Sequence, residues 1–465
     1  MRSADTRTVV CVDFGSTFTK ASLVDLDAGM ILASAAHPTT IDSDVLDGFA
    51  ACRTTLAGSD PRAADAPVLA CSSAGGGLRI AVVGNEELVT AEAGRRVALS
   101  SGGKVVAVHA LASRVPEDYL QGVLRHTAPD VVLLTGGTDG GNAESLVAGA
   151  HALVDAGWTG PVVVAGSVDA RDEVGSVLAG LPHVLADNVV PRIGVLAPES
   201  ARAAIREMFL AHVIGGKHLS ASDDFRHMVR GATPDVVLAG VELLARGLDE
   251  TRRGAGDVAV VDVGGATTDV HSVVALDPEE AGLSREVVAV TPVTRTVEGD
   301  LGMRWSALST VEAAQLDGQL DDLLDEARRR HDDPGFLPAD DAGADVDEAI
   351  ARAAVGLALR RHVGRSRVVV SPEGRVLERT GKDLREVDLL IGSGGVLRNG
   401  RDGVAERVLG PSIGPDPEGG WQLPRSPRVV VDHDYVLCAV GLLAGPEPEA
   451  AYGLATRLAG RPRQA

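Results

Sequence analysis

The chain is poor in aromatic residues and in cysteine. Aromatics make up 3% of its 465 residues, while hydrophobic residues of all kinds make up 45%. Ala, Val and Leu must therefore fill the cores between regular elements, which suits an α/β protein. No CxxC pair is present, so neither a zinc site nor a thiol-redox motif is indicated, and a reducing compartment is expected. The four cysteines are Cys11, Cys52, Cys71 and Cys438.

Positive charge is also scarce. The chain has 65 acidic and 44 basic residues, a formal net charge of -21, and only four of the basic residues are lysines. Nucleic acids and anionic lipids need a basic face, so neither is expected as a partner. The apolar run at residues 9–12 is far too short for a signal sequence or a membrane span. We therefore expect a soluble, cytoplasmic protein.

The length predicts several domains, because 465 residues exceed what one core usually holds. Short strands near the N-terminus are expected to form an antiparallel meander. Between residues 70 and 190, Val-rich runs alternate with helical stretches, which predicts βαβ units and a parallel sheet. The meander strands are expected at 9–12, 21–24 and 31–35, and the parallel strands at 80–84, 104–109, 130–135, 161–166 and 183–187.

The second half of the chain repeats this style of organisation. Thr233 and Pro234 are expected to begin a helix that runs to about residue 247. Strands are expected at 258–263 and 271–276, and a last buried strand is expected at 388–392. An apolar helix at 435–443 is expected to follow. The acidic stretch 312–347 could hold a divalent metal, although a solvated helix pair is the commoner reading. The expected domains are a first half (1–69 and 191–250), an inserted region (70–190), a second half (251–445) with an acidic helical subdomain (about 276–386), and a tail (446–465).

Two segments of the chain resemble each other. Residues 9–19 (VVCVDFGSTFT) and 259–269 (AVVDVGGATTD) each consist of a strand, an aspartate, a glycine two residues later, a hydroxyl-rich turn and a second strand. The aspartates are Asp13 and Asp262. Such a pair suggests two duplicated halves whose hairpins face each other across a cleft.

The composition of these turns is suited to binding a polyphosphate. Glycine lets the backbone approach a phosphate, and turn N–H groups and hydroxyls donate to its oxygens. Asp13 and Asp262 would repel that anion without an intervening cation, which implies Mg²⁺ held through water. Asp269 or a neighbouring acid could orient an attacking water. The alternative is two ordinary hairpins whose aspartates accept from turn N–H groups. The candidate phosphate ligands are Gly15, Ser16, Thr17, Gly264, Gly265, Thr267 and Thr268.

A third motif makes the alternative less attractive. Residues 389–396 (LLIGSGGV) run from a strand into a glycine turn that could pack flat against an adenosine. Its candidate ligands are Gly392, Ser393, Gly394 and Gly395.

Together the motifs resemble those of a known superfamily. Residues 262–270 are close to the second phosphate loop of the heat-shock seventy-kilodalton chaperones, residues 13–17 look like their first loop, and residues 392–395 resemble the adenosine motif shared with actin and sugar kinases. Gly299 and Asp300 lie where relatives place nucleotide-facing residues. The resemblance implies duplicated ribonuclease H-like (actin-like ATPase) halves with a nucleotide cleft, an inserted parallel α/β region, and ATP with Mg²⁺ as ligands.

A narrower resemblance covers nearly the whole chain. The sequence is similar to the glutamate mutase accessory family, called MutL or GlmL, which is unrelated to the mismatch-repair protein. This resemblance implies that Lys20 belongs to the nucleotide site and that the partner is an adenosylcobalamin-dependent mutase, from which an ATP-driven chaperone would release damaged cobalamin. The segments that carry it are 12–20, 38–40 (PTT), 72–76 (SSAGG), 135–142 (TGGTDGGN), 186–189 (ADNV), 261–274 and 296–304 (TVEGDLGMR).

Several other signals stay ambiguous or fail. The loop 135–142 could be a second anion site or a structural glycine loop, and the segment 72–77 with Arg79 has the same two readings. No GxxxxGK[ST] motif is present, which excludes a P-loop. Residues 410–414 match GxSxG without a preceding strand, so a nucleophile elbow is not expected. His271 is expected on a sheet face and not as a metal ligand.

Four functions compete at this point. The leading one is an ATPase switch that changes its grip on a protein partner. A small-molecule kinase would need a base beside an acceptor pocket, and the sequence identifies none. A hydantoinase-like, ATP-dependent hydrolase and a binding-only scaffold are the other two. The sequence does not indicate the oligomeric state.

Overall fold

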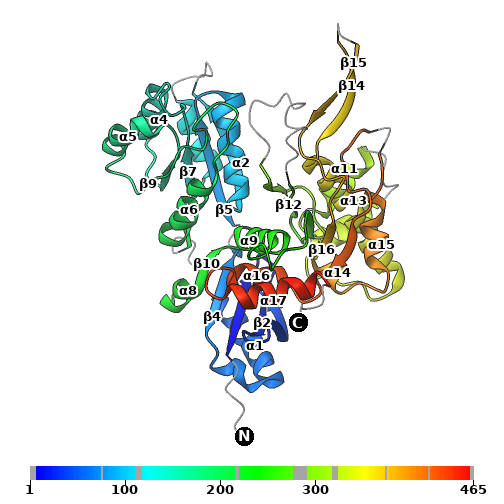
Figure 1. Ribbon diagram of the computed structural model, residues 1–465. Coiled ribbons are helices and arrows are strands. Elements are labelled where there is room, and N and C mark those ends of the chain that lie inside the picture. The colour runs from blue at the N-terminus through cyan, green and yellow to red at the C-terminus, as the bar shows by residue number, and fades with distance from the viewer. Residues whose placement is uncertain are drawn as a thin grey trace. The chain divides into compact units, whose positions relative to one another are not determined.

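The computed structural model describes residues 7–74, 77–111, 118–214, 219–275, 291–316, 323–371, 374–416 and 419–460. These residues form two compact units (Figure 1). Unit 1 holds most of the chain up to Leu238, and unit 2 holds Leu26–Ile31 and most of the chain from Ala239 onward. No helix among these residues combines the length and apolar character that crossing a bilayer requires.

The first sheet of unit 1 contains the expected N-terminal meander. Strand β1 pairs antiparallel with β2, and β3 follows after a four-residue turn that only an antiparallel neighbour allows. On its other side β1 pairs parallel with β4, which pairs parallel with β10. The order β10-β4-β1-β2-β3 is built from Thr8–Phe14 (β1), Phe18–Asp25 (β2), Met30–Pro38 (β3), Val68–Ser72 (β4) and Val229–Ala232 (β10).

The main sheet of unit 2 has the same topology. Its order is β13-β12-β11-β16-β17, in which β11 pairs antiparallel with β12 and parallel with β16. The duplication and the ribonuclease H-like fold class are therefore confirmed, because both central strands carry the repeated Asp-x-Gly motif at their ends. The strands are Val258–Val263 (β11), Thr268–Val273 (β12), Val293–Glu298 (β13), Leu389–Ser393 (β16) and Arg428–Val431 (β17).

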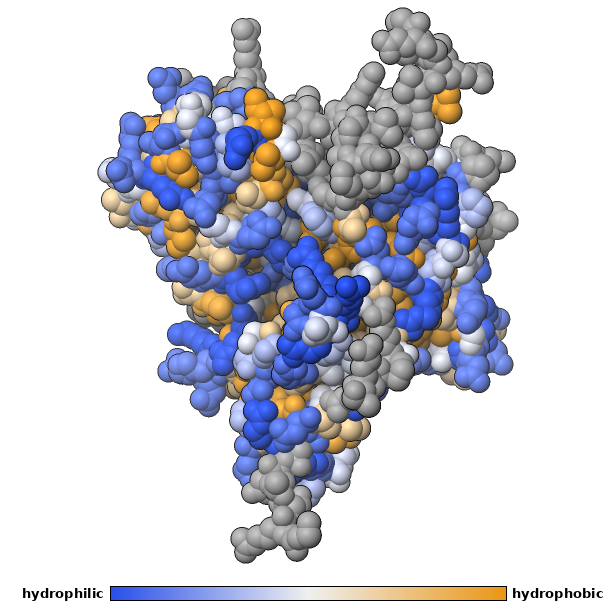
Figure 2. Space-filling view, in the orientation of Figure 1, coloured by the Kyte–Doolittle hydropathy of each residue, from blue (hydrophilic) through white to orange (hydrophobic). Residues whose placement is uncertain are grey.

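A second, fully parallel sheet lies in unit 1. Its order, β6-β5-β7-β8-β9, confirms the βαβ series and corresponds to the doubly wound order 2-1-3-4-5. Valine and leucine predominate in the central strands of this sheet, which are buried on both faces, whereas the edge strands are partly exposed. The surface over this region mixes hydrophobic and hydrophilic residues (Figure 2). The strands are Leu78–Gly84 (β5), Gly103–Ala110 (β6), Val131–Leu134 (β7), Val162–Val164 (β8) and His183–Leu185 (β9).

Helices complete unit 1. The N-cap of α1 is Asp44, whose carboxylate accepts from Leu46 N, and Thr233 opens α9 as expected. The α-helices are Val45–Ser59 (α1), Glu92–Ser100 (α2), Tyr119–Thr127 (α3), Glu144–Asp155 (α4), Arg171–Val177 (α5), Glu199–Met208 (α6), Asp223–Met228 (α8) and Thr233–Arg246 (α9), the last of which continues into unit 2.

The helices between residues 307 and 408 pack on one core with the unit 2 sheet. The longest, Asp341–His362 (α13), contacts β11 and β12. A hairpin of Arg365–Ser371 (β14) and Gly374–Thr380 (β15) follows it. The other helices are Ala307–Leu316 (α11), Leu324–Asp332 (α12), Gly395–Arg398 (α14), Val404–Val408 (α15), the 3₁₀ turn Gly410–Ser412 (η6), Val436–Leu443 (α16) and Pro448–Leu458 (α17).

The sequence reasoning missed two elements of the C-terminal part. Strand β17 follows the last buried strand and pairs parallel with it; the partly exposed side chains of β17 hide it from a search for buried runs. The stretch beyond 446 is not simply a tail. Pro448 suits the first turn of α17, which buries Ala451 and Leu454 and contacts α16.

Candidate functional site

Asp13 is held rigidly at the end of β1. Its side chain is 2% exposed. Thr233 Oγ1, at the start of α9, donates to Asp13 Oδ1 at 2.5 Å, and the Lys20 ammonium lies 3.8 Å from Oδ2. The Cys71 thiol also donates to Oδ1, at 3.6 Å. Asp13 thus connects β2, β4 and α9. The hydrogen bond from Thr233 to Asp13 is not evident from the sequence, which indicates only that Thr233 begins a helix.

The turn after Asp13 closes tightly and leaves its tip accessible. Gly15 N donates to Phe18 O at 3.2 Å, and a Cβ on Gly15 would lie 2.6 Å from that oxygen, so only glycine fits. Thr39 fixes the turn by donating to Gly15 O and Thr17 O. Ser16 is exposed and Thr17 half-buried. Within the described part of the chain, neither of their N–H groups has a partner.

The second turn repeats this geometry. Gly264 N donates to Thr267 O at 2.9 Å, and a Cβ on Gly264 would lie 2.9 Å from that oxygen. Met303 N, Arg304 N and Ser306 Oγ donate to the carbonyls of residues 264, 265 and 266, respectively. The segment after β13 therefore donates hydrogen bonds to the carbonyl oxygens of the turn.

The N–H groups of the second turn remain available. Among the described residues, those of Gly265, Ala266 and Thr267 have no hydrogen-bond partner, and all three residues are half-buried. Successive free N–H groups in a turn form a concave site for an anion. Thr268 differs, because its side chain is fully buried and its hydroxyl has no described partner.

Two carboxylates face each other beside this turn. The register of β11 and β12 places Asp262 opposite Asp269, and cross-strand Cβ atoms are roughly 5 Å apart. Arg295 Nη2 donates to Asp269 Oδ1 at 3.0 Å, which compensates one of the two charges. Arg295 is itself 5% exposed, and its Nε and Nη1 have no described partner. Burial, with Arg295 adjacent, lowers the pKa of His271 well below its ordinary value, so this histidine is neutral.

The carboxylate pair fits a magnesium ion bound together with phosphate. Like charges on opposite strand positions destabilise a sheet, and a divalent cation would offset them. Mg²⁺ commonly binds to one or two carboxylates plus phosphate oxygens and keeps several waters. No group of three or more His, Cys, Asp or Glu side chains suited to a metal occurs in the described ranges.

The glycine turn at 392–395 adjoins the same strand end. Ser393 is the register partner of Asp262, and Gly394 has φ +104° and ψ 163°. A Cβ on Gly394 would lie 2.1 Å from Val263 O, whereas one on Gly395 would meet nothing within 4 Å. One end of the unit 2 sheet thus brings together three predicted features: the turn at 264–268, the Asp262–Asp269 pair and the glycine turn.

Asp300 and Gly299 follow β13 directly. Arg361 donates to both carboxylate oxygens of Asp300, at 2.7 and 2.9 Å, and to Glu298 Oε2 at 2.8 Å. The hydrogen bond from Arg361 lowers the pKa of Asp300, whereas burial raises the pKa of Glu298. The contact of residues 299 and 300 with a nucleotide stays a prediction.

The loop at 135–142 uses its polar groups internally. Gly140 N donates to Asp169 Oδ2 at 2.6 Å, Val168 N donates to Asp139 Oδ1 at 3.2 Å, and Asn188 Nδ2 donates to the same oxygen at 2.8 Å. Because these bonds connect the loops after β7, β8 and β9, the structural reading is favoured over an anion site.

Arg79 has a structural role as well. It donates to Thr127 O at 2.5 Å and to Ala128 O at 3.2 Å, at the C-terminal end of α3. It is thus a helix cap and not a phosphate ligand. Gly75 and Gly76 of the neighbouring segment lie outside the described residues.

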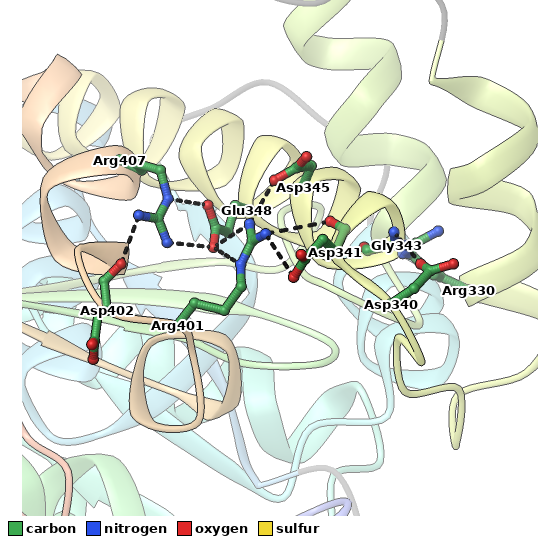
Figure 3. A network of polar contacts seen from close by, with 9 residues as sticks. All are labelled: Arg330, Asp340, Asp341, Gly343, Asp345, Glu348, Arg401, Asp402 and Arg407. Carbon is green, nitrogen blue, oxygen red and sulfur yellow. Dashed lines mark hydrogen bonds and ion pairs between the residues drawn. The ribbon is translucent and has the colours of Figure 1, made fainter.

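Sequence reasoning missed an ion-pair network on α13 (Figure 3). Arg401 and Arg407 both donate to Glu348, whose side chain is 8% exposed; their hydrogen bonds, above all that from Arg407, lower the pKa of Glu348 to about 2. Arg304 and the fully buried Arg330 donate to Asp347. The acidic stretch is therefore not merely solvated, and Arg304 connects it to the turn at Gly265. The partners lie up to 59 residues apart in sequence, so no local pattern reveals them.

Comparison with known proteins assigns nearly the whole chain to one family. The family model described as MutL protein matches residues 9–458. "Protein MutL" of Clostridium tetanomorphum is 36% identical over 453 residues, which is 95% of this chain and 96% of that protein.

Similarity to solved structures is weak. A nucleotide-free acetone carboxylase aligns with a TM-score of 0.40 at 15% identity, over 94% of this chain and 70% of the other. The activator of 2-hydroxyisocaproyl-CoA dehydratase from Clostridium difficile, with bound ADPNP, aligns with a TM-score of 0.32 at 10% identity, over 98% and 99%.

Proposed function

Because this chain belongs to the MutL family, we propose that it is an ATP-binding accessory protein that hydrolyses ATP to reactivate an adenosylcobalamin-dependent mutase, such as glutamate mutase. One observation carries the nucleotide part of this proposal. Two turns with the same hydrogen-bond geometry each follow an aspartate-bearing strand and each present N–H groups without a described partner. Such N–H groups favour phosphate oxygens. The mutase part rests on family membership.

Several groups contribute to binding ATP. Its phosphate oxygens accept hydrogen bonds from the turn N–H groups of residues 265–267 and of Ser16 and Thr17. The hydroxyls of Ser16, Thr17 and Thr267 and the Lys20 ammonium also bind the phosphates. The turn at Gly392, Ser393, Gly394 and Gly395 packs against the adenosine. Asp262 and Asp269, with Asp13, hold Mg²⁺ through water, and that ion neutralises charge on the phosphates when bound.

Hydrolysis needs a water placed in line with the terminal phosphate. Asp269 is the candidate for orienting it, because Arg295 fixes one carboxylate oxygen and leaves the other for the water. The Asp269 carboxylate accepts from the water, which orients it and stabilises the positive charge that develops on it. Arg295 is thus a positioning residue for the reaction.

Isothermal titration with ATP, with and without Mg²⁺, tests the proposal. We expect magnesium-dependent binding by the unaltered protein and much weaker binding by Asp262→Asn at the same Mg²⁺ concentration, because loss of one charge leaves the cation without half of its carboxylate pair. Asp325→Asn is the matched control, since Asp325 is 98% exposed on α12. Magnesium-independent binding, or unchanged binding by Asp262→Asn, would contradict the site assignment.

The mutase role requires a second measurement. We expect purified glutamate mutase, inactivated by turnover, to stimulate phosphate release by this protein. Stimulation by small metabolites instead would support a kinase of the same fold, and ATP-dependent ring opening of a hydantoin would support the hydrolase alternative.

A further inference from the structure

A pocket in unit 2 has a volume of about 250 Å³. It is lined by one face of α13, by two residues of η6 and by Leu423. Since a water occupies about 30 Å³ in the liquid, this volume suits a ligand the size of roughly eight waters. The lining residues are Arg352, Ala353, Gly356, Arg360, Pro411, Ser412 and Leu423.

The helical spacing explains how the pocket forms. Positions 352, 356 and 360 are four residues apart, so they lie on one face of α13. Gly356 has no side chain, which leaves space between the two arginines. Ala353 and Leu423 are buried against the unit 2 core and provide an apolar floor. Most small-molecule sites combine such a floor with a few polar groups.

The polar groups of this pocket are suited to an anion. Two arginines line it, and no acidic residue does. In the described part of the chain, Arg352, which is exposed, has no ion-pair or hydrogen-bond partner. Ser412 is only 5% exposed, and its hydroxyl has no described partner either. A ligand would satisfy both groups.

We infer that this pocket binds a small organic dianion, with Arg352 and Arg360 as its charged contacts and the Ser412 hydroxyl as a donor. The Cα atoms of the two arginines are about 12 Å apart along the helix. Their long side chains can converge on one phosphate group or each hold one carboxylate of a dicarboxylate. The two sources share the same chemistry, a compact molecule with two negative charges, and are distinguished by the test.

Titration of the full-length protein with succinate and, separately, with inorganic phosphate tests the inference. We expect at least one of them to bind with a Kd below about 1 mM. Tighter binding of succinate would identify a dicarboxylate site, and tighter binding of phosphate a phosphate site. Arg352→Gln should weaken binding at least tenfold, because it removes a charge-assisted contact, and Ser412→Ala should weaken it several-fold. Arg352→Gln should leave ATP binding unchanged.

The control is Arg425→Gln, an exposed arginine of unit 2 that lies outside the pocket. It should bind the dianion as the unaltered protein does. Asp262→Asn should also retain succinate binding, which separates this site from phosphate bound at the turns. The inference is wrong if neither ion saturates the protein at roughly 10 mM, or if Arg352→Gln and Arg425→Gln weaken binding equally.

Discussion

Adding one methyl group at Gly394 tests whether the glycine turn and the phosphate turn of unit 2 form one site. The backbone of Gly394, at φ +104° and ψ 163°, lies in a region that is essentially restricted to glycine, and forcing another residue there costs about 1–3 kcal/mol. The new Cβ would also lie 2.1 Å from Val263 O. Relieving such an overlap by backbone movement costs about 1–3 kcal/mol more.

Gly394→Ala should therefore lower the free energy of unfolding by about 2–6 kcal/mol, or displace the turn from Val263, or both. Either result disturbs the strand end that holds Asp262, so we expect ATP affinity to fall at least tenfold. Gly395→Ala is the matched control one residue further on, where the added methyl meets nothing within 4 Å. It should change the unfolding free energy by less than about 0.5 kcal/mol.

Urea denaturation followed by circular dichroism gives the unfolding free energies, and isothermal titration gives the affinities. If the two variants lose stability equally, the close packing of Gly394 on Val263 does not matter, and the reasoning is refuted. If Gly394→Ala is destabilised yet binds ATP normally, the glycine turn is not part of the nucleotide site.

Three further outcomes are expected. Asp13→Asn and Asp262→Asn should each lower ATP turnover at least about a hundredfold in a phosphate-release assay, the scale of losing one electrostatic contact to a transferring phosphoryl group; unchanged rates would contradict the assignment. Glu348→Gln should lower stability by about 1–3 kcal/mol near pH 7, because the pKa of Glu348 is about 2 when folded and about 4.3 when unfolded. The stabilisation by the Glu348 carboxylate is fully present above pH 4.3 and is lost as the pH falls through 2. Between these two pH values, the free energy of unfolding should therefore fall less in Glu348→Gln than in the unaltered protein, which an acid titration measures. Burial raises the pKa of Cys52 to about 11 and all four thiols are buried, so Ellman's reagent should react at neutral pH only after unfolding.

The sequence predicted those parts of the fold that depend on short stretches of chain. The hairpins at Asp13 and Asp262 were found because an aspartate, a glycine and hydroxyl residues occur within five positions, and that local pattern also determines the turn. The parallel sheet was predicted because valine runs alternate with amphipathic helices. In each case the side chains that determine the structure are neighbours in the sequence.

Other features depend on distant partners and could not be predicted in this way. Strand β17 has a weak pattern of its own and is fixed by pairing with β16. Glu348 looks like any acid at the start of a helix until Arg401 and Arg407 are brought beside it. Likewise, the Thr135–Asn142 loop resembles an anion site in sequence, and only the folded positions of Asp169 and Asn188 give its polar groups internal partners.

The two repeated aspartates, which look equivalent in sequence, have different surroundings. Asp13 is 2% exposed and bonded to Thr233 and Lys20, whereas Asp262 is half-buried and faces Asp269. A hydrated cation reaches a half-buried carboxylate more easily than one that is 2% exposed, so we expect Mg²⁺ to depend mainly on the pair in unit 2. Asp13 then acts chiefly by fixing the first turn against α9.

Titrating ATP at increasing Mg²⁺ concentrations separates these roles. Asp262→Asn should shift the magnesium requirement upward at least tenfold, because half of the carboxylate pair is lost. Asp13→Asn should lower ATP affinity while shifting the magnesium midpoint much less than Asp262→Asn does, and Thr233→Val should reproduce that effect by removing the hydrogen bond to Asp13. Equal shifts of the magnesium midpoint in Asp13→Asn and Asp262→Asn would mean that both aspartates hold the ion alike, as the sequence repeat alone suggests.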